Sequence, residues 1–194
     1  MLKYYKIFII FILIPLAGCS KSIISEVSRF HNLPTANAET IEVVSLDPNR
    51  QNSLEFSQYA ALVGQHLGKI GYQPPQNTPS QLIAVIDYHM QPAGSAIDSG
   101  PRSSVGIGVG SGGRRSSVGI GLSIPIGEND PPQAYMRILT LEIIQRSDGV
   151  KLYEGQAASR GPEALPVIMP YLVNAIFQDF PGNSGSSNKV KAQP

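Results

Sequence analysis

The sequence predicts an α+β domain in which two helices pack on one face of a mostly antiparallel sheet. Two amphipathic stretches with helical spacing, at about 53–70 and 163–179, separate groups of strand-like segments. The strand-like segments are residues 23–31, 40–46, 82–88, 134–145 and 150–158. The chain has 194 residues, of which 42% are hydrophobic, enough for one domain with a core. We therefore expect a single α+β domain over residues 26–181.

The first helix is predicted from an apolar stripe that ends at a glycine. The stripe consists of Tyr59, Leu62, Val63, Leu67 and Ile70. His66 lies on the same face, which favours a core or boundary position for this histidine. Asn52 can cap the helix with Glu55 three residues on, and Gly71 suits the left-handed geometry of a helix end.

The second helix has a longer stripe and two prolines. The stripe consists of Leu165, Ile168, Met169, Leu172, Val173, Ile176, Phe177 and Phe180. Pro166 suits a first turn, whereas Pro170 should kink the helix or delay its start. Pro181-Gly182 ends the helix, and the polar residues 182–194 are expected to form a disordered tail.

The strands differ in how much of each should be covered. Residues Leu82–Tyr88 are apolar on both faces until Asp87, which predicts a central strand covered on both sides. Asp148-Gly149 predicts a tight hairpin between the last two strands.

An internal repeat predicts a glycine-rich β-hairpin within residues 103–126. The hexapeptide Ser103–Gly108 recurs as Ser116–Gly121, and in both copies Val and Ile alternate with Gly. Arg114 and Arg115 at the hairpin tip are candidate contacts for lipid headgroups or an acidic partner. The alternative is that this pair only keeps a turn solvated.

The N-terminus has the pattern of an export signal. Two lysines precede the apolar run 7–16, which is too short to span a bilayer. Leu16-Ala17-Gly18-Cys19 then resembles the lipobox of bacterial lipoproteins, in which the cysteine thiol receives diacylglycerol and the peptide is cut before it. We expect residues 1–18 to be removed and residues 19–25 to form a tether. The alternative is an ordinary signal peptide that ends in cysteine.

This resemblance also implies a location. In lipoproteins a residue other than Asp after the cysteine directs the protein to the outer membrane, and Ser20 occupies that position. We therefore expect a lipid-anchored protein on the periplasmic side of the outer membrane. Without Lys3 and Lys6 the mature chain has 13 basic and 14 acidic residues, so no nucleic-acid partner is expected.

Motifs for cofactors, metals and catalysis are weak. Gly108–Gly113 matches G-x-G-x-x-G, but a strand-like segment follows it where a dinucleotide site needs a helix. The histidines His31, His66 and His89 lack metal-ligand spacing, and Cys19 is the only cysteine. We expect no cofactor, no metal and no catalytic residue. Asp87 and His89 alternate on one strand face and can form an acid–base pair, although a solvated strand end is the simpler interpretation.

Several short motifs in order resemble a bacterial lipoprotein family, domain of unknown function 4136. They are the lipobox, Arg29-Phe30, Ser53–Phe56, Tyr59–Leu62, Gly71-Tyr72, Leu82–Tyr88, the glycine-rich segment, Leu152–Gly155 and Phe180–Gly182. The chain departs from the family by lacking tryptophan in the glycine-rich segment. The resemblance implies a location and a fold, because the family has no established activity.

These observations favour a non-catalytic envelope lipoprotein that binds or scaffolds other components. Its expected partners are a membrane, through lipid on Cys19, and an envelope protein. Two alternatives remain open. One is a membrane-inserting or pore-associated role for the hairpin at 103–126, and the other is a small periplasmic hydrolase that uses Asp87 and His89.

Overall fold

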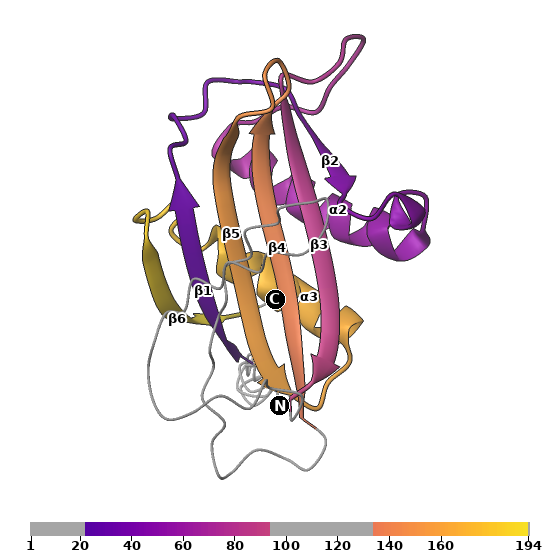
Figure 1. Cartoon of the computed structure of the whole chain (residues 1–194), viewed down its shortest axis with the longest axis vertical. Coiled ribbons are helices and arrows are strands. Elements are labelled where there is room, and N and C mark those ends of the chain that lie inside the picture. The colour runs from indigo at the N-terminus through magenta and orange to yellow at the C-terminus, as the bar shows by residue number, and fades with distance from the viewer. Residues whose placement is uncertain (1–21, 94–133, 194) are drawn as a thin grey trace, which may run out of the picture.

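The structure is a computed structural model that describes residues 22–93 and 134–193, and it confirms the α+β class. Its six strands form one sheet in the order β2-β3-β4-β5-β1-β6 (Figure 1). The elements are β1 (Ile23–His31), β2 (Ile41–Ser45), the short 3-10 helix η1 (Pro48–Arg50), α2 (Leu54–Ile70), β3 (Leu82–Pro92), β4 (Tyr135–Gln145), β5 (Lys151–Gly161), α3 (Leu165–Phe177) and β6 (Ser186–Ala192).

The sheet is antiparallel except for one pair. β2 and β3 are parallel, and the chain crosses between them through α2. A parallel pair needs such a crossover, because a tight turn reverses the direction of the chain. The other four pairs are antiparallel, and the hairpin predicted at Asp148-Gly149 joins β4 to β5.

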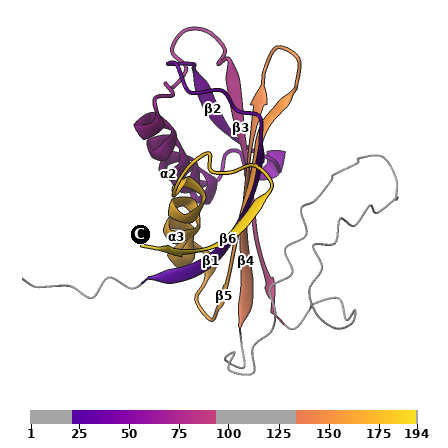
Figure 2. The ribbon, with the colours of Figure 1, turned by 90° about the vertical axis from the view of Figure 1, so that its left-hand side faces the viewer.

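The two helices lie behind the sheet in Figure 1 and to its left in Figure 2. Alternate strand residues, such as Ala84, Ile86, Leu139 and Leu141, are fully buried, whereas their neighbours along each strand are half-buried. The core is therefore built from every second side chain along the strands, together with the apolar stripes of both helices. The predicted burial of both faces of Leu82–Tyr88 is therefore wrong, because only every second residue of this segment is fully buried.

α2 confirms the predicted helix, with one change at its start. The cap is Ser53, whose side chain accepts a hydrogen bond from the backbone N–H of Phe56, and so the predicted Asn52 cap is wrong. Gly71 closes the helix at φ 119°, as expected. Ile70 is 36% exposed, because the last turn extends beyond the core.

α3 runs through Pro170 without interruption, so the alternative of a delayed start is wrong. Pro166 lies in the first turn, where its missing N–H costs no helical hydrogen bond. The helix ends at Phe177, because Gln178 is extended and Asp179 has a φ of 60°.

The predicted disordered tail at 182–194 is wrong, because residues Ser186–Ala192 form β6 on the outer edge of β1. Val190 and Ala192 are buried on the core side of this strand. The predicted tether is also too long, since β1 already begins at Ile23. Residues 186–191 are mostly polar, so the sequence gives no strand signal there. The strand forms with Val190 and Ala192 as its buried apolar side chains.

Several sequence-based predictions lie outside the described residues. They concern the signal peptide at 1–18, the lipobox Leu16, Ala17, Gly18 and Cys19, the Gly108–Gly113 motif, and the hairpin at 103–126 with Arg114 and Arg115. Where the described chain resumes, the N–H of Ala93 donates to the carbonyl of Ala134 at 2.9 Å. Within the described parts, no helix is both long and apolar enough to cross a membrane.

Candidate functional site

Antiparallel pairing brings four strand termini together at each end of the sheet. We call the end with His31, Leu82, Gln145 and Lys151 the upper end, as it appears in Figure 1. The opposite, lower end carries Ile23, Pro92, Tyr135 and Gly161. Loops converge only where strands stop, so a surface site is most readily built at one of these two ends.

The upper end holds a cleft of about 550 Å³. Its walls come from the loop after β1, the end of α2, the loop before β3, the end of β4 and the start of β5. The lining residues are Leu33, Pro34, Glu39, Tyr72, Pro79, Ser80, Gln81, Leu82, Gln145, Arg146, Ser147 and Leu152. The lining thus combines apolar and polar side chains, and ligand-binding clefts use the first for burial and the second for orientation.

Arg146 holds one wall of the cleft in place. Its Nε donates to the carbonyl of Ser80 at 2.7 Å, and its Nη2 donates to the Ser80 hydroxyl at 2.9 Å. The same guanidinium forms an ion pair with Glu42 on β2. Because Ser80 is buried, these contacts tie the loop before β3 to the end of β4.

Tyr72 and Glu39 form another part of the lining. Burial raises the pKa of the Tyr72 phenol, and the carboxylate of Glu39 raises it further, so the phenol stays neutral at physiological pH. Thr40 and Gln81 exchange hydrogen bonds of 3.1 and 3.0 Å between backbone N–H groups and side chains. The cleft can therefore hold an apolar group, with a carboxylate and a guanidinium among its polar linings.

Asp87 and His89 lie on the sheet face turned away from the helices, outside the cleft. His89 Nδ1 and Asp87 Oδ2 are 3.8 Å apart, and both side chains are at least a third exposed. The neighbouring hydroxyl of Thr140, directly opposite Asp87, accepts a hydrogen bond from Gln156 at 3.3 Å. The predicted pair is thus close in space, but neither residue lines the cleft.

The other two histidines contact groups of the domain itself. His66 stacks on Phe177 with ring centroids 4.9 Å apart, as expected for a boundary residue, and burial lowers its pKa. His31 Nε2 lies 3.0 Å from the carbonyl of Gly182. In residues 22–93 and 134–193, no cluster of three His, Cys, Asp or Glu side chains could hold a metal ion.

A structural cluster at the end of α3 contains residues from three of the motifs shared with the resembled family, Arg29-Phe30, Leu152–Gly155 and Phe180–Gly182. Arg29 is only 3% exposed, and its Nη2 donates to the carbonyls of Ala175, Ile176 and Gln178 at 3.0, 3.3 and 2.8 Å. These carbonyls have no partner within the helix, and their partial negative charge favours a cation. Arg29 therefore caps α3 from β1.

Two aromatic residues complete this cluster. The Tyr153 ring packs against Phe180 at 4.7 Å and lies across Gly155, where an added Cβ would sit 2.4 Å from the phenol oxygen. Burial raises the pKa of Tyr153 to about 12, although Arg29 opposes the rise. Gly182, at φ 78°, passes beside Arg29 in the same way. These motif residues pack the end of α3 against the sheet and do not line the cleft, whereas Tyr72, Leu82 and Leu152 from the same set of motifs do.

Sequence reasoning missed the cleft. Tyr72 belonged to a recognised motif, but Leu33, Ser80 and Arg146 carry no local signal, because their contacts join segments far apart in the chain. Arg146 directly follows β4, and only the pairing of β3 with β4 brings it to Ser80.

The chain is similar in sequence to a protein family and to an individual protein. A family model described as "Domain of unknown function (DUF4136)" matches residues 28–182. An uncharacterized protein of Zymomonas mobilis subsp. mobilis is 27% identical, over 86% of this chain and 80% of its own length.

Two solved structures are similar at low identity. A PDZ domain protein from Parabacteroides distasonis is 12% identical with a TM-score of 0.48, over 88% of this chain but only 39% of that protein. The PelC dodecamer from Paraburkholderia phytofirmans is 9% identical with a TM-score of 0.40, over 77% of this chain and 91% of that protein. Likenesses of this size carry no argument about function.

Proposed function

The chain belongs to the family of domain of unknown function 4136, and we propose that it is a non-catalytic envelope lipoprotein that binds a partner through its upper cleft. Lipid on Cys19 would anchor it to the outer membrane, with the domain on the periplasmic side. The lipobox at Leu16–Cys19 supports the anchor, and the cleft supports a binding role.

The observation that carries the proposal is the position of the cleft relative to the start of β1. β1 begins at the lower end, four residues after Cys19, whereas the cleft opens at the upper end. The strands between the two ends have eleven residues, which corresponds to roughly 35 Å at about 3.3 Å per residue. An anchored chain would therefore present its cleft away from the lipid surface and toward the periplasm.

The anchor is tested by the intact mass of the protein purified from its host's membranes. A chain that begins at Cys19 and carries acyl groups is the expected result, with Cys19→Ala as the unlipidated control. A full-length or acyl-free mass in the soluble fraction would contradict the proposal. Density-gradient separation of the two membranes then tests the outer-membrane location.

The binding role is tested by photo-crosslinking inside cells from two exposed serine positions. Ser147 lines the cleft, and Ser57 lies on the exposed side of α2 as the matched control. We expect a photoreactive residue at Ser147 to give one adduct of defined mass that Ser57 does not give. Equal adducts from both positions, or none from Ser147, would exclude the cleft as the binding surface.

A further inference from the structure

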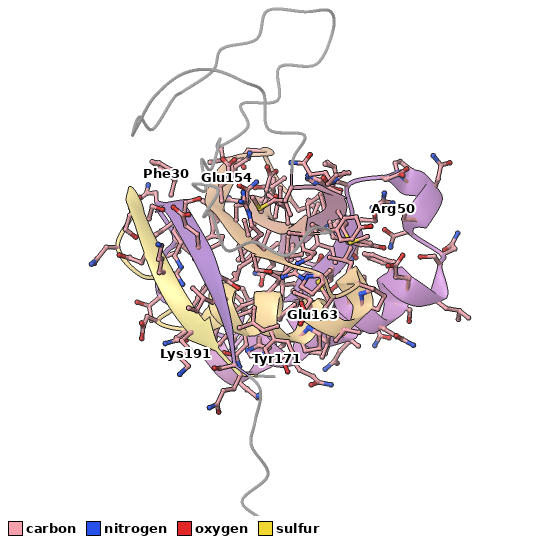
Figure 3. All side chains as sticks on the ribbon, turned by 90° about the horizontal axis from the view of Figure 1, so that it is seen from below. Phe30, Arg50, Glu154, Glu163, Tyr171 and Lys191 are labelled. Carbon is pink, nitrogen blue, oxygen red and sulfur yellow. The ribbon has the colours of Figure 1, made fainter. Side chains whose placement is uncertain are left out.

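The lower end of the sheet presents an exposed apolar side chain beside lysines. Ile24 on β1 is 63% exposed, and its cross-strand partner on β6 is Lys191. Two residues on, Glu26 is paired with Lys189. Directly paired residues project from the same face of a sheet, so Ile24, Lys189 and Lys191 share one surface. Figure 3 looks onto this end and labels Lys191.

This surface lies close to the proposed anchor along the chain. Ile24 is the fifth residue after Cys19, and a fully extended chain covers at most about 3.6 Å per residue. The Cα of Ile24 is therefore within about 18 Å of the Cα of Cys19 whatever path the chain takes. Lys21 also lies within this stretch.

The charges at this end favour an anionic surface. Lys189 and Lys191 on β6 are both exposed. Arg137 is buried against Glu163 at 3.1 Å, so these two charges compensate each other. The acidic side chain of Glu26 also lies on this face, and it accepts a hydrogen bond from Ser187 at 3.2 Å.

We propose that Ile24, Lys189 and Lys191 form a membrane-contact surface that rests on anionic lipid headgroups. The inference rests on the lipid anchor of the proposed function and adds an orientation to it. An isoleucine enters the headgroup region while the flanking ammonium groups bind lipid phosphates, a combination that binds anionic membranes. The contact limits rocking of the domain about its short tether and keeps the cleft pointed away from the membrane.

The test compares two positions on the same face of the same strand. Ile24→Cys and Phe30→Cys are made separately in the lipidated full chain, and each is labelled with the thiol-reactive fluorophore bimane. Phe30 is 46% exposed and lies six residues, about 20 Å, nearer the upper end. The sulfur of a lipidated Cys19 is a thioether and does not react.

The labelled proteins are reconstituted in vesicles of phosphatidylcholine and phosphatidylglycerol that contain a nitroxide-labelled lipid as quencher. We expect quenching at position 24 to exceed quenching at position 30 several-fold. The excess should fall in vesicles of phosphatidylcholine alone, which lack the anionic headgroup. Equal quenching at the two positions in the anionic vesicles would overturn the proposal.

A pair of charge reversals tests the role of the lysines. Lys191→Glu should reduce quenching at position 24 toward the value at position 30. Lys69→Glu, at an exposed position in the last turn of α2, should leave it unchanged. Equal effects of the two reversals would also overturn the proposal. Labelling at Cys19 itself, or an intact mass without acyl groups, would instead show that the anchor is missing, and both proposals would then fail.

Discussion

At the scale of single residues, Arg29 is the side chain on which the domain depends most clearly. Arg29 is buried, and one of its nitrogens donates hydrogen bonds to three carbonyls at the end of α3. Arg50, by comparison, is half-exposed and donates to the single carbonyl of Tyr88 at 2.6 Å. A carbonyl that loses its partner inside the protein is costly, and Arg29 serves three carbonyls where Arg50 serves one.

We expect Arg29→Met to lower the free energy of unfolding by about 3 kcal/mol or more, because three carbonyls lose their donor together. The matched variant Arg50→Met should cost about 1 kcal/mol, from one hydrogen bond and one cation–π contact with Tyr88. Urea unfolding followed by circular dichroism measures both values. Equal losses would show that Arg29 does not cap α3.

His66 provides a pH-dependent prediction. Burial lowers its pKa below the ordinary value of 6.5, so the folded state binds fewer protons than the unfolded state. The stability that it contributes is therefore present above about pH 6.5 and is lost as the pH falls through the lowered pKa of the folded state.

We expect the urea midpoint of the natural chain to fall between pH 7.5 and pH 5.5 by more than that of His66→Gln, which cannot titrate there. The two proteins differ at one side chain, so the contributions of other titrating groups cancel. Parallel pH profiles would mean that the stack on Phe177 does not depend on a neutral imidazole.

At the scale of elements, β6 protects the edge of the sheet and adds to the core, although most of its residues are polar. It covers the edge of β1 over residues Ile23–Arg29 and contributes Val190 and Ala192 to the core. Without it, β1 would become an edge strand with unpaired backbone groups and the exposed side chain of Ile24.

Removal of residues 186–194 should lower the free energy of unfolding by about 2 kcal/mol or more and promote self-association through β1. Removal of residues 193–194 alone, which lie beyond β6, is the control and should change neither property. Unfolding curves and light scattering distinguish these results. An unchanged stability after the longer truncation would show that β6 is dispensable.

At the scale of the whole molecule, β3 and β4 are paired over their full described lengths. Pro92 faces Tyr135, and the hydrogen bond between Ala93 and Ala134 holds these two residues at the distance of a hairpin's last pair. The strand pair can therefore be closed by a short turn, and a shorter loop costs less closure entropy.

We expect replacement of residues 94–133 by Asn-Gly to leave a folded domain that is no less stable than the full chain. Thermal unfolding of both proteins provides the comparison. A loss of stability would mean that the replaced segment packs on the sheet.

The same variant tests the pore alternative, since leakage from vesicles should disappear with the segment if the hairpin at 103–126 inserts in membrane.

The sequence by itself determined both helices and five of the six strands of residues 22–93 and 134–193, together with the family resemblance and the lipobox pattern. These features are local: helical spacing marked α2 and α3, and Asp148-Gly149 marked the turn between β4 and β5. Pro170 was the local signal that allowed a delayed start, which α3 does not have, because the packing of its apolar stripe outweighs one missing hydrogen bond.

Only the tertiary structure decided the order of the strands, the parallel pairing of β2 with β3, the existence of β6, the role of Arg29 and the cleft. Each of these depends on contacts between residues far apart in the chain, such as Arg29 with Gln178 or Arg146 with Ser80. Polar residues give no periodic signal for such contacts, because their partners come from strand pairing and from the ends of other elements. Local patterns therefore define the elements, and packing between distant segments builds the site.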